Sequence, residues 1–256
     1  MEIVIIGSGN VATQLALTFK AKGIIIKQVY SFNSRNAEKL AKQVDADYIS
    51  DISGLYMDAD IYFYALKDSA LRSLLRKMEV PTGIQVHTAG SIPISEFEGL
   101  STKFGVFYPV QTFSIEKPID FTNVPICIEA SNIDVQHKLV ELAQLISAKS
   151  YLMSSDQRRK VHLAAVYACN FSNFMYDISS KILLDAGISF DILKPLIVET
   201  ANKITTITPF EAQTGPAVRM DVKTTSKHVS MLSKYSNYRR IYKLLTKSIY
   251  ARHKKK

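Results

Sequence analysis

A glycine-rich loop near the start of the chain has the spacing that binds phosphate groups. Gly7-Ser8-Gly9-Asn10-Val11-Ala12 follows a short apolar run and opens a stretch with apolar residues at helical spacing. The first glycine of such a loop permits a tight turn, the second lets the backbone approach a pyrophosphate, and the helix N-terminus faces the anion. The pattern therefore predicts a dinucleotide site at Gly7, Ser8, Gly9, Asn10 and Val11, with an ordinary strand-to-helix turn as the alternative.

The segment after the second predicted strand indicates which dinucleotide is bound. An NAD site usually carries Asp or Glu here, which binds the ribose 2′-hydroxyl. This chain has no carboxylate at that place and offers Asn33-Ser34-Arg35 instead. Amide, hydroxyl and guanidinium donors suit a 2′-phosphate, so we expect NADP rather than NAD. A solvated turn is the alternative for Asn33.

Three further loops follow predicted strands and should meet at one edge of the sheet. Ligands of open α/β sheets lie outside the carboxyl ends of the strands. Leu66 and Lys67 follow one such strand, and we expect them to run past the cofactor. His87, Gly90 and Gln111 follow the next two, and we expect them to line a substrate pocket. Lys67 as a surface residue and His87 as a hydrogen-bonded strand-end residue are the alternatives.

A long predicted helix in the second half carries polar residues on one face. His162, Asn170, Asn173 and Asp177, with apolar Val166 between the first two, follow one another at intervals of three or four residues. Buried polar groups need partners, so the stripe invites an explanation. We interpret His162 as a proton donor and Asn170 as an amide that orients the substrate. The alternative, which we prefer for Asp177, is a set of polar groups satisfied inside the domain or across a dimer interface.

The order of the predicted elements gives the fold class. Strands at residues 3–7, 23–31, 61–66, 84–87, 104–108, 124–129 and 150–153 alternate with helices, whereas only helices are predicted afterwards, at 156–185, 190–206, 221–234 and 237–253. Alternation of this kind predicts an α/β fold, a Rossmann-type and mostly parallel sheet, followed by an all-helical C-terminal domain. We place the domains at residues 1–153 and 154–256. Pro195 should kink or split the helix that contains it.

Composition excludes several classes of protein. The 256 residues are 47% apolar and 21% charged, as in folded soluble proteins, and no run approaches the ~20 apolar residues of a membrane span. The opening segment has no basic region or cleavage site of a secretory signal, so we expect a cytoplasmic protein. Two cysteines make no disulfide framework, and no Cys/His set has zinc spacing, so we expect no metal.

The net charge of +9 comes from one end of the chain. Residues 219–256 hold 12 Lys and Arg residues against a single acid, Asp221. A basic amphipathic helix can bind nucleic acid or anionic membranes. We prefer a packed terminal helix with a solvated basic face, because cations near a helix C-terminus are favourable in any case. We therefore expect neither nucleic acid nor a membrane as a partner.

Several motifs in order resemble a known family. These are Gly7-Ser8-Gly9-Asn10-Val11-Ala12, His87-Thr88-Ala89-Gly90, Pro109-Val110-Gln111-Thr112-Phe113, His162 with Asn170, and Thr214-Gly215-Pro216-Ala217-Val218-Arg219. The chain resembles bacterial Rossmann-like candidate NADP oxidoreductases that carry a helical C-terminal domain of unknown function. It is more distantly similar to pyrroline-5-carboxylate reductases, deazaflavin-dependent NADP reductases and β-hydroxyacid dehydrogenases. The resemblance implies an NADP-binding first domain and a helical second domain that often builds a homodimer.

Three positions depart from this resemblance. Relatives commonly have His where this chain has Tyr108, and Gly where it has Met220. The β-hydroxyacid dehydrogenases use a Lys on the long helix, and no Lys of this chain matches it.

The resulting hypothesis is an NADP-dependent oxidoreductase that transfers hydride between NADPH and a small carbonyl or imine substrate. Thr214, Gly215 and Arg219 would close the pocket on an anionic group of the substrate. The alternative is a non-catalytic NADP-binding sensor or interaction protein.

Overall fold

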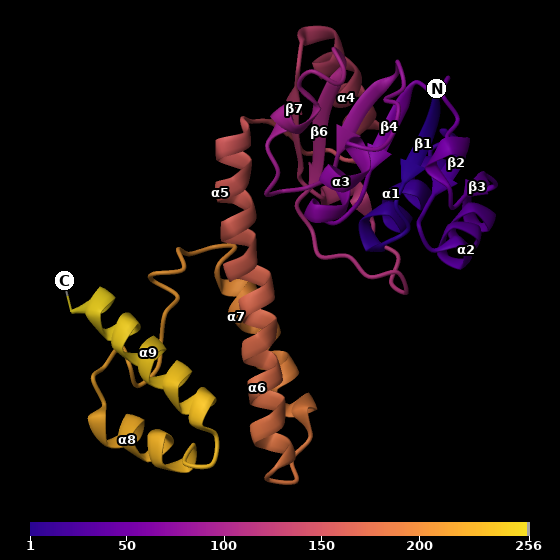
Figure 1. The fold of residues 1–256 in the computed structure, drawn as a ribbon. Helices are drawn as coiled ribbons and strands as arrows, with labels where there is room; N and C mark the ends of the chain where they lie inside the picture. Colours follow the sequence, from indigo (N-terminus) through magenta and orange to yellow (C-terminus); the bar gives the residue numbers. More distant parts are fainter. Residues whose placement is uncertain (255–256) are drawn as a thin grey trace. The chain divides into compact units, whose positions relative to one another are not determined.

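A computed structural model describes residues 1–254, and in it the chain divides into two compact units. The first unit comprises residues 1–170 and the second begins at Phe171. Each is described by itself, with the elements labelled as in Figure 1. None of the described helices is long and apolar enough to cross a membrane.

An eight-stranded sheet forms the centre of the first unit, in the order β3-β2-β1-β4-β5-β6-β7-β8 (Figure 1). Its strands are β1 (Glu2–Ile6), β2 (Ile25–Tyr30), β3 (Asp47–Ile49), β4 (Ile61–Tyr64), β5 (Ile84–His87), β6 (Phe104–Pro109), β7 (Ile126–Ala130) and β8 (Ser150–Leu152). All neighbouring strands pair in parallel except β6 and β7, which are antiparallel. The carboxyl ends of β1, β2, β4, β5 and β6 therefore lie at one edge of the sheet.

Helices cover both faces of this sheet. They are α1 (Asn10–Ala21), α2 (Ser34–Val44), α3 (Asp68–Leu75) and α4 (Ile133–Ile146), with short 3-10 turns η1 (Ile52–Gly54), η2 (Ile94–Phe97) and η3 (Phe121–Asn123). Helix α5 (Ser155–Ala165) follows β8. Successive residues of β1 point to opposite faces. Ile3 and Ile5 join one buried cluster with α1, α2 and α4, whereas Val4 and Ile6 join another with α3 and η2.

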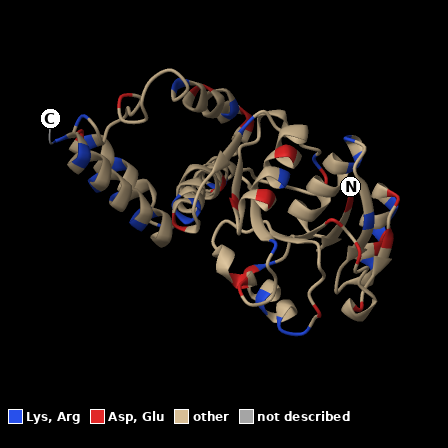
Figure 2. Cartoon of the chain, turned by 90° about the horizontal axis from the view of Figure 1, so that it is seen from above, with Lys and Arg blue, Asp and Glu red and all other residues tan. Residues whose placement is uncertain are grey.

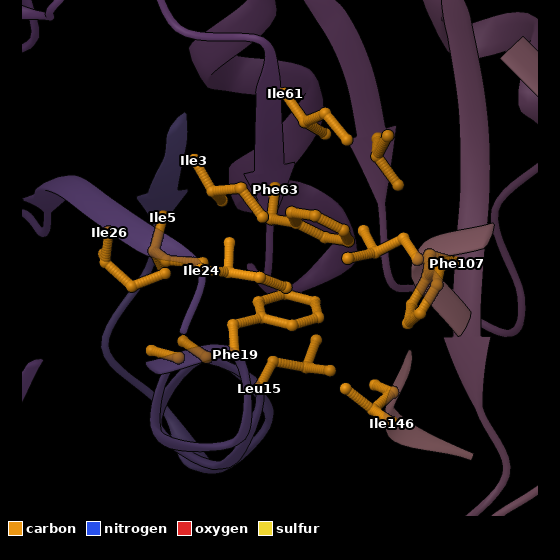
Figure 3. Packing of buried hydrophobic residues seen from close by; sticks show 14 of the residues in the cluster. Ile3, Ile5, Leu15, Phe19, Ile24, Ile26, Ile61, Phe63, Phe107 and Ile146 are labelled. Atoms are coloured by element: carbon orange, nitrogen blue, oxygen red, sulfur yellow. The ribbon is translucent and has the colours of Figure 1, made fainter. Parts of the chain in front are cut away.

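Aromatic rings fill the centre of the larger cluster, as Figure 3 shows. The Phe19 ring from α1 lies 5.2 Å from Phe63 of β4, and Phe63 lies 5.5 Å from Phe107 of β6 in an edge-to-face arrangement. Offset and edge-to-face pairs of this kind add to the stabilisation that comes from apolar burial. The cluster fixes α1, and with it the loop that precedes α1, against the sheet.

The second unit is helical. Its elements are α6 (Ser172–Leu184), the 3-10 turn η5 (Phe190–Leu193), α7 (Lys194–Lys203), α8 (Val222–Met231) and α9 (Ser236–His253). The predicted split at Pro195 is confirmed, because Pro195 lies in the first turn of α7, where a missing N–H costs nothing. Lys and Arg recur along α9, the helix that ends at the C-terminus in Figure 2.

The predicted α/β class and mostly parallel sheet are confirmed, and two details of the prediction are wrong. The edge strand β3 was not predicted, and the long helix is not uniform, since a π-helical segment, η4 (Val166–Phe171), separates α5 from α6. Strand β7 is also reversed, which the alternation of elements alone did not indicate. The domain boundary between residues 153 and 154 stays a prediction, although the strands do end with β8.

Candidate functional site

The turn between β1 and α1 requires its first glycine. Gly7 has a φ of +130°, and a Cβ added to it would lie 2.3 Å from the carbonyl oxygen of Ala65. Its N–H donates to the Tyr30 carbonyl at 2.8 Å, which ties the turn to β2. A side chain is therefore excluded by contact as well as by conformation. The role of Gly7 toward a dinucleotide stays a prediction.

The second glycine leaves the start of α1 open. Gly9 is the N-cap of α1 and offers no side-chain cap, and a Cβ added to it would meet nothing within 4 Å. Buried Ala12 packs the first turn against the sheet. The first backbone N–H groups of a helix have no intrahelical partner and favour an anion. The turn thus combines orphan donors with open space, as the interpretation of Gly7 and Gly9 requires.

Two side chains of the loop connect it to neighbouring segments. The hydroxyl of Ser8 lies 2.7 Å from that of Ser31, at the end of β2. The amide of Asn10 donates to the Phe113 carbonyl at 2.7 Å, so this side chain holds the loop after β6. Val11 is half-buried against the core. Ser31 was not among the predicted site residues, although its place at a strand end next to the glycine loop was a usable signal.

The Asn33-Ser34-Arg35 segment lies at the start of α2 and is exposed. Asn33 is the N-cap and accepts from the Asn36 N–H at 3.2 Å, so its side chain has a structural role. Within residues 1–254 the Arg35 guanidinium has no acidic partner. Phe32 is 92% exposed, which leaves its ring free to stack on a planar ligand.

The predicted residues after β4 and β6 lie at the same edge of the sheet. Leu66 is half-buried, and exposed Lys67 is the N-cap position of α3 without a capping side chain. Gln111 is exposed, and its side-chain oxygen accepts from the Thr112 N–H at 2.8 Å. The roles of all three toward a ligand stay predictions.

His87, at the end of β5, is fully buried. Its Nδ1 accepts from the Ala89 N–H at 3.2 Å, and its ring stacks on Phe97 at 5.9 Å between centroids. Its Nε2 is buried and has no partner among the described residues. Burial, helped by the charge of Arg158, lowers the pKa of His87 to about 3, so the ring is neutral at physiological pH. A pocket-lining role for this side chain stays a prediction.

His162 lies in a contact that joins three separate segments. Its Nδ1 is 3.1 Å from the hydroxyl of Tyr108 in β6, and the two rings meet edge to face. A Cβ added to Gly90, in the loop after β5, would lie 2.8 Å from both rings. Predicted residues Gly90 and His162 are thus in direct contact, 72 positions apart in the sequence. Tyr108 was missed as a site residue, although its position at a strand end and the His that relatives commonly have there both pointed to it.

A buried guanidinium holds α5 in place for this contact. Arg158 is fully buried and donates to the Glu129 carboxylate of β7, the Ile92 carbonyl and, at 3.2 Å, the Ser155 hydroxyl. The Ser155 N–H donates to the same carboxylate at 2.8 Å. Arg158 precedes His162 by four residues, so both lie on one face of the helix. The clamp therefore sets where His162 meets the sheet edge.

The remaining predicted residues lie at the end of the first unit or in the second unit. Asn170 is exposed and ends the first unit within the π-helical segment. Thr214 and Arg219 are exposed in the second unit, and Gly215 there has a φ of +110°. Their parts in substrate binding stay predictions. No group of three or more potential metal ligands occurs among the residues that the structure describes.

Comparison with protein families divides the chain into two matches. Residues 2–87 match the family described as NADP oxidoreductase, coenzyme F420-dependent. Residues 124–249 match a domain of unknown function, DUF2520. None of the curated proteins compared with the sequence matches it.

Solved structures add similarity over the full length. A candidate NADP oxidoreductase from Bacteroides fragilis is 42% identical, with 98% of each chain covered and a TM-score of 0.93. A protein from Thermotoga maritima is 18% identical, with 96% of this chain and 98% of that chain covered and a TM-score of 0.78. An imine reductase from Myxococcus stipitatus, solved with NADP⁺, is 14% identical, with 100% of this chain and 93% of that chain covered and a TM-score of 0.71.

Proposed function

Since the chain belongs to the same NADP oxidoreductase family as the Bacteroides fragilis protein, we propose that it transfers hydride between NADPH and a small carbonyl or imine compound. An imine substrate is supported by the imine reductase that shares the fold. The alternative of a non-catalytic NADP sensor has less support, because the similar proteins with an assigned activity are oxidoreductases.

The observation that carries the proposal is the turn at Gly7 and Gly9. A positive φ at Gly7 and open space at Gly9 bring uncapped helix amides to the carboxyl edge of a parallel sheet. This cradle fits a pyrophosphate, and Arg35, which has no acidic partner among residues 1–254, supplies a guanidinium for a 2′-phosphate. The bound NADPH supplies the hydride.

The chain's own part in the chemistry is the movement of a proton. His162 lies at the carboxyl edge of the sheet, where its imidazole is held against Tyr108 and Gly90. We assign it as the donor of the proton that the substrate oxygen or nitrogen gains when the adjacent carbon gains hydride. Asn170 is proposed to orient the substrate.

Cofactor binding tests the first half of this proposal. Calorimetric titration of the purified protein should give a lower dissociation constant for NADPH than for NADH. Arg35→Ala should weaken NADPH binding by about tenfold to a hundredfold, the worth of a charge-assisted hydrogen bond, and leave NADH binding unchanged. Lys138→Ala removes an exposed cation beside the starts of β4 and β5, at the other edge of the sheet, and should change neither constant. Equal binding of both dinucleotides would refute the assignment of NADP.

Turnover tests the second half. We expect NADPH oxidation with at least one member of a panel of cyclic imines, iminium ions and 2-keto acids. His162→Ala should lower kcat by about 10²–10⁴, the usual worth of a general acid, while the dissociation constant of NADPH stays the same. Loss of binding and turnover in equal measure would instead indicate a structural role for His162.

We also propose that the second unit pairs with a second copy of the chain. Of residues 171–254 only Leu232 is buried, and large apolar side chains on α6, α7 and α8 are exposed. Monomeric proteins seldom expose contiguous apolar surface on this scale. A homodimer would cover these helices, as the resemblance to dimeric proteins implies.

We also propose a cytoplasmic location. Cys127 and Cys169 are both free thiols. Unpaired cysteines persist in reducing compartments. Burial raises the pKa of Cys127 to about 11, so this thiol is unreactive and structural.

A further inference from the structure

The contact between Tyr108 and His162 depends on the absence of a side chain at Gly90. The two ring centroids are 5.9 Å apart at an angle of 75°, and a hydrogen bond of 3.1 Å joins the phenol oxygen to Nδ1. A methyl group on Gly90 would lie 2.8 Å from Cγ and Nδ1 of His162 and from Cζ of Tyr108. Contacts this short would force the neighbouring rings to move. The ring pair therefore requires glycine at this position.

The hydrogen bond is made by side chains whose positions are already fixed. Tyr108 is in β6, where it pairs with Cys127 of β7. The Arg158–Glu129 ion pair holds α5 one turn before His162. Both residues are half-buried. Because both rings are already held, they lose little conformational freedom when the hydrogen bond forms. The hydrogen bond can therefore select one nitrogen of the His162 ring.

The two nitrogens of the His162 ring have different surroundings. Nδ1 faces the phenol, whereas Nε2 has no hydrogen-bond partner within residues 1–254. A phenol can donate to a bare ring nitrogen and can accept from a protonated one. Burial raises the pKa of Tyr108, with a smaller rise from Cys127 and an opposing effect of the Arg158 charge. Tyr108 therefore keeps its proton at neutral pH. Its hydroxyl can donate to a bare Nδ1 or accept from Nδ1–H.

Resting on the reductase function proposed above, we propose that Tyr108 is a positioning residue that reserves Nε2 of His162 as the proton-donating atom. When the His162 ring is charged, the phenol oxygen accepts a hydrogen bond from Nδ1–H. The proton that leaves the ring is therefore the one on Nε2. The Nε2–H bond breaks and an O–H or N–H bond forms on the substrate, whose carbon receives its hydride from NADPH. The neutral ring recovers its proton from water, and Tyr108 is unchanged at the end.

The first experiment needs neither cofactor nor turnover. The full-length protein is labelled with ¹⁵N-histidine, and the His162 signals are assigned by their loss in His162→Ala. In alkaline buffer the wild type should show mainly the Nε2–H tautomer, because the phenol donates to Nδ1. Tyr108→Phe keeps the ring but removes the hydroxyl, and it should move both nitrogen resonances toward an average of the two tautomers. Gly90→Ala should have the same effect by displacing the rings.

The second experiment is a double-mutant cycle on kcat. Tyr108→Phe alone should lower kcat about threefold to tenfold, the worth of one hydrogen bond, with the dissociation constant of NADPH unchanged. In a His162→Ala background the same change should have no further effect, because Tyr108 acts through His162. A further loss there would make Tyr108 itself the proton donor and overturn the proposal.

The two experiments separate this inference from the function on which it rests. Resonances of His162 that do not respond to Tyr108→Phe or to Gly90→Ala refute the role of Tyr108, whatever the enzyme reduces. A responsive His162 in a protein that binds no NADPH would instead confirm the pair and refute the reductase function. Thermal unfolding shows whether Tyr108→Phe or Gly90→Ala loses the fold. If one of them does, the response of His162 in the other variant tests the role of Tyr108.

Discussion

The two units of the chain use their apolar residues in opposite ways. In the first unit both faces of the sheet are covered, and two clusters of side chains are almost fully buried. In the second unit Leu232, at 9% exposure, is the only residue of 171–254 that is buried, whereas Ile192 and Leu196 are 67% and 60% exposed. The first unit therefore contains the surfaces that stabilise it. The second exposes apolar helices, and helices gain most of their stability from packing, which supports the homodimer that we propose.

The largest effect should come from charging that exposed apolar surface. Ile192→Glu with Leu196→Glu should convert a dimer to a single chain of 28.7 kDa, measured by sedimentation equilibrium. Two apolar side chains of this size are worth roughly 3–6 kcal/mol when buried, or at least a hundredfold in the dissociation constant of the dimer.

The first unit offers a matched control for that experiment. Ile133 and Leu145 on α4 are 58% and 51% exposed, but α4 already packs its other side on the sheet. Ile133→Glu with Leu145→Glu should leave the mass in solution unchanged. A wild-type protein that sediments as one chain at all concentrations would refute the homodimer proposed for the second unit.

A second prediction concerns the only arginine that the first unit buries completely. Arg158→Met leaves the Glu129 carboxylate and the Ile92 carbonyl without their donor, and it should lower the free energy of unfolding by about 3–5 kcal/mol. Arg159→Met is the control, because that neighbour makes an exposed pair with Asp156 worth at most about 1 kcal/mol. Urea unfolding measures both. Similar losses for the two variants would show that burial of Arg158 contributes little.

A third prediction separates folding from binding at the glycine loop. Gly7→Ala places a Cβ against the Ala65 carbonyl at a positive φ, so it should cost roughly 2–4 kcal/mol of stability. Gly9→Ala meets no neighbouring atom and should leave the urea midpoint nearly unchanged. Gly9→Ala should nevertheless weaken NADPH binding, because its methyl group enters the open space at the helix start. If NADPH binds Gly9→Ala as tightly as wild type, that space does not hold the pyrophosphate.

Local patterns predicted much of the first unit. The strand, glycine turn and helix at residues 3–21 follow from nearest-neighbour chemistry, and so does the split of a helix at Pro195. The reversal of β7 depends on how its strand pairs with β6, and the π-helical segment interrupts a run whose spacing fits one α-helix. Three-residue β3 is too short to show any alternation.

In the candidate site, too, local patterns were predictable and contacts between residues distant in the sequence were not. The glycine loop was predictable because Gly7 and Gly9 act within a few residues of each other. The contact of His162 with Tyr108 was not, because 54 positions separate the two and the contact depends on how Arg158 and Ser155 hold α5 against Glu129. The burial of His87 could not be predicted either. The sequence shows only a polar residue at a strand end, and the Phe97 ring that stacks on it comes from a later segment.

At mildly acidic pH His87 gives the smallest effect, about 1.4 kcal/mol at one pH unit below the pKa of an unfolded histidine, and it concerns the first unit alone. The native pKa of His87 is lowered to about 3 by burial, whereas an unfolded histidine titrates near 6.5. Above pH 6.5 both states are neutral at this residue and its contribution to stability is complete. As the pH falls from about 6.5 toward 3, only the unfolded chain binds the proton, so stability falls by at most about 1.4 kcal/mol per pH unit.

This contribution can be isolated by subtraction. His87→Gln removes the titrating group and keeps an acceptor for the Ala89 N–H, so its free energy of unfolding should fall less steeply below pH 6.5 than that of the wild type. His137→Gln, at an exposed histidine on α4, should follow the wild-type curve. The carboxylates that titrate in the same range are common to all three proteins and cancel in the differences. If the pH dependence of the free energy of unfolding were the same for His87→Gln and wild type, the His87 ring would take up a proton while the unit stays folded. That result would contradict the full burial of this ring.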